Sequence, residues 1–179
     1  MSENAAKTRG YWFDYGGWRA LFASRYFWVA LVGAGLLFPI WSKSGWWDLV
    51  LGIIPSLLGV SLAAFALFLG AGTERFRQLL ASKELADEGG SPPFVVVSAT
   101  FVHFIVVQVL AVATALFCSA AYKMEVVSGF EVINSVLSYC FWGIGFFFFS
   151  YSILLVLAAA FGIYEISRWF EEFVRSGQK

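Results

Sequence analysis

The sequence predicts an all-α membrane protein with four transmembrane helices, and three observations lead to this prediction. Hydrophobic residues make up 60% of the 179 residues, whereas charged residues make up only 13%. A soluble domain carries about 25% charged residues. The charged residues also gather in short stretches, which leave four long apolar segments between them. Such segments are expected to lie in lipid.

Each apolar segment is long enough to cross a bilayer. A hydrocarbon core about 30 Å thick needs about 20 residues of helix, because every backbone polar group has to be satisfied within the segment. The predicted spans cover residues 20–41, 49–71, 94–122 and 136–164. They are expected to form a single domain over residues 1–179. The lipid bilayer is its expected main partner, and the balance of 12 basic and 12 acidic residues argues against nucleic acid.

The distribution of basic residues predicts the orientation of the chain. All but two of the 12 Lys and Arg residues lie before or at the start of the first span, between the second and third, or after the fourth. Only Lys43 and Lys123 fall in the other two loops. Because cytoplasmic loops keep the positive excess, both termini are expected in the cytoplasm, with the protein in the inner (plasma) membrane.

The second span carries a repeat of small residues. They follow alternating steps of four and three, which places them on one helix face. They are Gly52, Ser56, Gly59, Ala63, Ala66 and Gly70. This small-residue seam would let two helix backbones approach closely. The seam is expected either to make this span the central helix of the monomer's own bundle, which we favour slightly, or to meet its copies in a homo-oligomer.

The third span carries a mildly polar stripe. It consists of Thr100, His103, Thr114 and Cys118, with Ala111 on the same face. One interpretation is an interhelical hydrogen bond that holds the packing, and the other is a pore-lining or pH-sensing surface. Gln108 lies about 140° around the helix from His103 and faces different surroundings.

The segment after the fourth span, residues 165–175, has the spacing of an amphipathic helix. Its apolar stripe consists of Ile166, Trp169, Phe170, Phe173 and Val174. It is expected to lie along the inner leaflet or to fold against the other cytoplasmic segments. The alternative is a docking helix for a cytoplasmic protein.

Residues that could carry chemistry are scarce. The sequence has no zinc-protease, phosphate-loop or nucleophile-elbow motif. His103 is the single histidine, and the span cores contain no Asp, Glu, Lys or Arg. The sequence therefore predicts a protein that is not an enzyme and binds no cofactor or metal. A proton-coupled transporter is also not expected, and Cys118 and Cys140 are expected to be free thiols.

One segment resembles known proteins. Pro55-Ser-Leu-Leu-Gly59-Val-Ser61-Leu62, followed by Leu69-Gly70-Ala71-Gly72 and Glu74-Arg75-Phe76, resembles a stretch of uncharacterised bacterial four-span inner-membrane proteins. The resemblance implies no biochemical role. The architecture alone is similar to the membrane components of bacterial anti-phage systems, which implies an oligomer that works with a soluble partner.

Two functions are expected from these patterns. The first is a homo-oligomeric, channel-like assembly that alters membrane permeability, based on the small-residue seam and the polar stripe. The second is a non-catalytic membrane anchor that recruits a cytoplasmic partner through residues 165–175, for example in a bacterial defence complex.

Overall fold

The computed structural model describes residues 10–70, 73–82, 91–128 and 135–176, and every regular element in them is an α-helix. This confirms the all-α prediction. Three helices are long and apolar enough to cross a membrane. They are α5 (Trp46–Gly70), α7 (Pro93–Ser128) and α8 (Ser135–Ser176). They match the predicted spans 49–71, 94–122 and 136–164, except that residue 71 lies outside the described residues.

The prediction of four spans is wrong, because the first apolar segment is broken. Residues 20–41 are divided among α2 (Gly17–Ala23), α3 (Arg25–Leu36) and α4 (Phe38–Trp41). Ser24 interrupts the helix with extended backbone (φ −70°, ψ 121°). The longest piece, α3, has 12 residues and therefore reaches only about 18 Å. It is too short to cross the hydrocarbon core alone.

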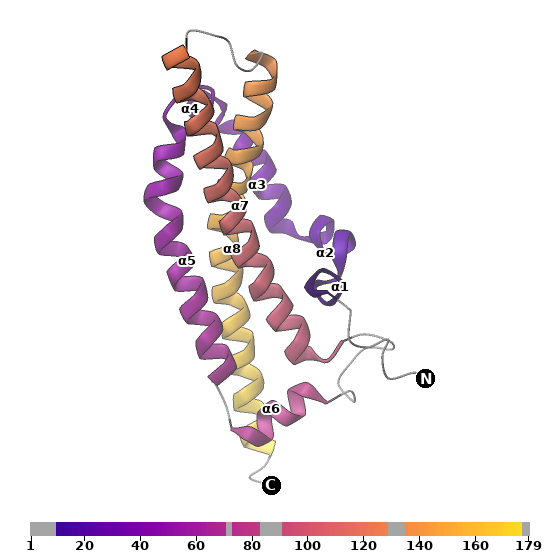
Figure 1. The fold of residues 1–179 in the computed structure, drawn as a ribbon. Coiled ribbons are helices and arrows are strands. Elements are labelled where there is room, and N and C mark those ends of the chain that lie inside the picture. Colours follow the sequence, from indigo (N-terminus) through magenta and orange to yellow (C-terminus); the bar gives the residue numbers. More distant parts are fainter. Residues whose placement is uncertain (1–9, 71–72, 83–90, 129–134, 177–179) are drawn as a thin grey trace, which may run out of the picture.

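The three long helices lie side by side and form the body of the molecule (Figure 1). α7 packs against both α5 and α8, and α3 packs against α8. α6 (Glu74–Ala81) lies at the lower end of the bundle in Figure 1. α1 (Tyr11–Tyr15) lies with α2 on the flank of the bundle, where α1 contacts α7.

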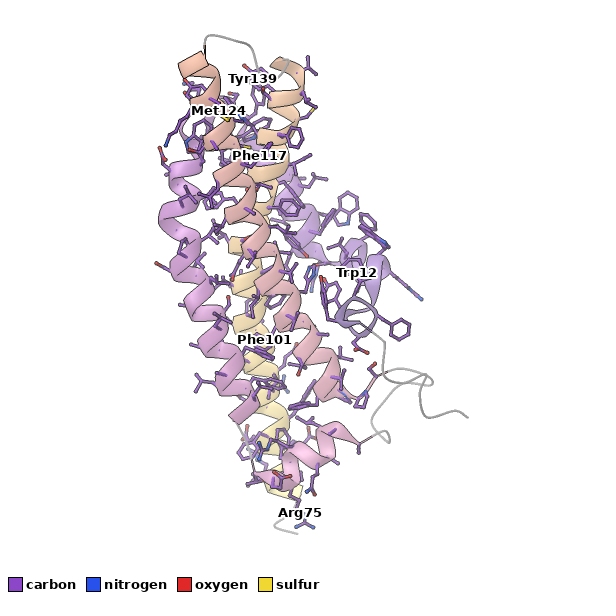
Figure 2. All side chains as sticks on the ribbon, viewed as in Figure 1. Trp12, Arg75, Phe101, Phe117, Met124 and Tyr139 are labelled. Carbon is purple, nitrogen blue, oxygen red and sulfur yellow. The ribbon has the colours of Figure 1, made fainter. Side chains whose placement is uncertain are left out.

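The interior consists of two apolar clusters, one above the other along the bundle. The upper cluster includes Trp46 and Trp47 of α5, which lie against α7 and α8. The lower cluster contains Phe101, whose ring stacks on those of Phe65 and Phe68 at centroid distances of 5.5 and 5.8 Å. Figure 2 shows Phe101 inside the lower half of the bundle, whereas Met124 and Tyr139 lie near its upper end.

At the lower end, α6 is held against the last turns of α8. Thr73 caps α6 by accepting a hydrogen bond from the Phe76 amide. The Phe76 ring is buried and lies 5.2 and 5.4 Å from the rings of Phe170 and Phe173. α8 continues without a break through residues 165–175. This segment is therefore the end of α8 and not a separate surface helix, and its rings pack against α6.

Candidate functional sites

A buried polar cluster lies where α7, α8 and the N-terminal helices meet. The Nε2 atom of His103 lies 3.3 Å from the Tyr151 hydroxyl, within hydrogen-bond distance. Tyr15 and Ser24 also lie near the Tyr151 hydroxyl and influence it electrostatically. Polar side chains from α1, the α2–α3 break, α7 and α8 thus gather at one place.

Aromatic rings close this cluster on the side of α1. The Tyr15 ring stacks on His103 at a centroid distance of 4.1 Å, and the Trp12 ring lies 6.1 Å from it. Figure 2 shows Trp12 on the flank of the bundle. Burial raises the pKa of the Tyr15 hydroxyl, while its hydrogen bond with Tyr151 acts in the opposite direction. Tyr15 is therefore uncharged at neutral pH.

His103 itself is incompletely satisfied. It is 4% exposed, and its Nδ1 atom is buried with no hydrogen-bond partner among the described residues. A buried polar atom without a partner costs free energy, and such atoms are rare in folded proteins. His103 is therefore the most unusual polar group in this part of the bundle.

A second polar pair joins α5 to α7. Gln108 is fully buried and donates a 2.9 Å hydrogen bond from Nε2 to the Ser61 hydroxyl, which is also buried. The Gln108 Oε1 atom has no partner in the described structure. This pair fixes the register between the two helices at one point within an otherwise apolar contact.

The polar stripe of α7 faces α8. Thr100 borders a groove of about 190 Å³ between the two helices, and His103 contacts Tyr151. The Thr114 hydroxyl lies beside Gly145 of α8, and Cys118 is buried near Trp142. Both threonine hydroxyls bond to carbonyls of their own helix. The geometry therefore supports the packing interpretation of the stripe within one copy.

The small-residue seam of α5 faces away from the bundle, so our favoured expectation that it packs inside the monomer is wrong. All six residues are exposed, and a Cβ atom added at Gly52, Gly59 or Gly70 would meet nothing within 4 Å. The buried residues of α5, such as Ile54 and Ser61, lie about 180° around the helix from the seam. The sequence predicted the seam, but it did not predict that the seam faces away from the other helices.

The apolar stripe of residues 165–175 is largely occupied. Phe170 and Phe173 contact Phe76 of α6, and Ile166 packs against the lower cluster. Trp169 and Val174 remain exposed. A docking partner would therefore find only part of the predicted stripe free.

Sequence reasoning missed the partners of His103. None of the sequence patterns singles out Tyr15, Trp12 or Tyr151. A tyrosine inside an apolar run is a signal, because a buried hydroxyl needs a partner. Cys118 and Cys140 are both free thiols, as expected, and the first is buried while the second is exposed.

Comparison with protein-family models, with curated proteins and with solved structures finds no match. The described residues contain no group of three or more His, Cys, Asp or Glu side chains that could hold a metal ion.

Proposed function

We propose that this chain is a membrane subunit that associates with copies of itself through the outward face of α5. The observation that carries the proposal is the exposure of all six seam residues. Small side chains let two helix backbones approach closely, and in lipid this packing replaces the missing hydrophobic driving force. The alternating steps of four and three favour a left-handed crossing.

The low burial of α5 supports the same proposal. In its most apolar stretch only 17% of the residues are buried, against 39% in both α7 and α8. α5 packs against α7 and, less extensively, against α8, so much of its surface is available for another copy. The seam lies in the middle of that available surface.

We further propose that the assembly alters membrane permeability. Within one copy the polar stripe of α7 is occupied by α8, and His103 and Cys118 are buried. A conducting passage would therefore lie between copies, next to the α5 seam, and not through the α7–α8 contact.

The charge distribution supports a cytoplasmic position for the lower end of the bundle. Four arginines of the described residues lie there, Arg75, Arg77, Arg168 and Arg175, whereas Lys43 and Lys123 lie at the other end. The hydrogen bond from Ser91 to Asp14 places α1 beside the start of α7. We propose that both chain termini are cytoplasmic in the plasma membrane. With three long spanning helices, this requires the broken segment α2 to α4 to cross the bilayer together as well.

The oligomeric state of the full chain in nanodiscs tests self-association. Native mass spectrometry is expected to show an oligomer for the wild type and mainly monomer for Ala63→Leu, because a larger side chain keeps the backbones apart. Ala160→Leu is the matched control, since Ala160 is an exposed alanine of α8. A wild-type monomer, or equal oligomers for all three proteins, would contradict the proposal.

Dye or ion release from liposomes tests the permeability function. Wild type and Ala160→Leu are expected to release their contents, and Ala63→Leu is expected to release them on the order of tenfold more slowly, because its copies are held apart. An oligomer that releases nothing would leave self-association standing and remove the permeability function.

A further inference from the structure

The first described helix is attached to the rest of the chain by a pair of glycines in unusual conformations. Gly16 and Gly17 have φ angles of 99° and 60°, a region that only glycine adopts readily. On one side of the pair lies α1, which has five residues. On the other side lies α2. Rotation at this pair, the second member of which begins α2, can move α1 relative to α2. It would break the ring contact of 5.1 Å between Trp12 and Trp18.

α1 packs against α7 and is held there by side-chain contacts of Trp12, Asp14 and Tyr15. The Ser91 hydroxyl donates a hydrogen bond to Asp14, and Tyr15 stacks on His103. Trp12 lies beside both rings, 5.8 Å from Tyr15 and 6.1 Å from His103. The aromatic side of α1 thus covers the His103–Tyr151 pair. We call α1 the strap.

Among the residues that the structure describes, no charged group is found in contact with the covered imidazole. From α1 it meets Tyr15, which is uncharged at neutral pH, and the Trp12 ring; from α8 it meets the hydroxyl of Tyr151. The nearby carboxylate of Asp14 is hydrogen-bonded by Ser91, and neither ion pair of the described chain involves His103.

We propose that protonation of His103 releases the strap, so that α1 is a pH-sensitive cover over the His103–Tyr151 pair. Histidine is the side chain whose ordinary charge change falls between pH 5 and 8. A buried charge without a counter-charge is costly, and the Nδ1 atom, which becomes a donor in the imidazolium, has no acceptor there. Release of α1 opens His103 to water and lipid headgroups.

The direction of the effect follows from these costs. The closed form disfavours the imidazolium, so it binds protons more weakly than the open form, and acid shifts the population toward the open form. Attraction between the imidazolium and the rings of Tyr15 and Trp12 acts the other way. This attraction is the smaller effect, because the free-energy cost of burying a full charge is larger than the stabilisation from a cation–π contact. The inference stands whether or not copies associate through α5.

Distance measurement between spin labels on the full chain in nanodiscs tests the proposal. One label replaces Phe13 on the strap and the other replaces Leu116, an exposed residue of α7, in a Cys118→Ala and Cys140→Ala background. At pH 8 a single narrow distance distribution is expected. At pH 5 the fraction of molecules with a second, displaced distance is expected to be about tenfold higher or more. Uptake of one proton by the open form is enough for a change of this size. An unchanged distribution between pH 8 and pH 5 would overturn the proposal.

Two variants identify the titrating group. His103→Phe keeps an aromatic ring in place and is expected to hold the strap at both pH values; if it does not fold, His103→Gln serves instead. Asp14→Asn is expected to retain the acid response. An acid response that persists without His103, or that disappears in Asp14→Asn, would assign the effect to another group and overturn the proposal.

Discussion

Individual buried polar residues determine where the long helices meet. Gln108 and Ser61 form the one polar contact described between α5 and α7, and only one of the two amide heteroatoms of Gln108 is satisfied. Hydrogen bonds between helices in membranes are worth about 0.6 kcal/mol on average and up to about 1.7 kcal/mol. The pair therefore contributes modestly to stability but discriminates against other registers.

Removal of the Ser61 hydroxyl is expected to destabilise the protein more than removal of the Gln108 amide. Ser61→Ala leaves both polar atoms of Gln108 buried without a partner, so we expect a loss of about 0.6 to 1.7 kcal/mol in the free energy of unfolding. Gln108→Leu removes the buried amide altogether, and Ser61 can bond to its own helix. Unfolding in mixed detergent titrations measures both, and a larger loss for Gln108→Leu would contradict this account.

A close approach at Gly145 is a second feature at this scale. An added Cβ atom there would lie 2.6 Å from the Trp46 ring, which is buried in the upper cluster. Gly145→Ala is expected to cost about 1 to 3 kcal/mol, because the ring has to shift in a packed core. Gly162→Ala is the control, since nothing lies within 4 Å of that position. Equal melting temperatures for the two variants would show that Trp46 can move freely.

At the scale of elements, the contact between α6 and the end of α8 closes the lower end of the bundle. α6 has eight residues, and isolated helices of that length are unstable in water. Its stability must come from the burial of Phe76 and Leu80. The ion pair between Glu74 and Arg77 is exposed and adds little.

Phe76→Ala is expected to release α6 from α8. Burial of a phenylalanine side chain is worth about 3 kcal/mol or more, which exceeds what α6 can supply on its own. The hydrogen-exchange rates of the α6 amides are expected to rise by about two orders of magnitude, because a loss of about 3 kcal/mol corresponds to that factor. The amides of α5 are expected to stay protected. Leu79→Ala, at an exposed position of the same helix, is expected to change little. Unchanged α6 exchange in Phe76→Ala would show that other contacts hold the helix.

At the scale of the whole molecule, the charges distinguish the two ends of the bundle. The lower end carries the arginines of α6 and of the last turns of α8, and Figure 2 shows Arg75 at its foot. The upper end carries tryptophans at the start of α5, which are typical of a membrane interface. This asymmetry is the basis of the proposed orientation, because cytoplasmic segments keep the positive excess.

Cysteine labelling of intact cells measures the orientation. In a Cys118→Ala and Cys140→Ala background, Lys123→Cys is expected to react with a membrane-impermeant maleimide. Arg75→Cys is expected to react only after the cells are opened, because the arginine-rich end is retained inside. The reverse pattern would invert the proposed topology, and reaction of both residues in intact cells would remove it.

The sequence by itself determined the class of the protein and the three long helices. Composition and the length of the apolar segments are enough for this, because the backbone of a chain in lipid has to form its hydrogen bonds internally, as a continuous helix does. The same reasoning failed for residues 20–41. Hydropathy averages over a whole segment, whereas the helix break occurs at the single residue Ser24.

Only the tertiary structure decided which face of each helix meets which neighbour. The α5 seam and the α7 stripe were both visible as periodic patterns, yet the seam lies outside the bundle and the stripe lies against α8. A period places residues on a common face, but the direction of that face depends on contacts between distant segments. The cover of α1 over His103 has the same origin, since Tyr15 and His103 lie far apart in sequence and meet only because α1 folds back beside α7.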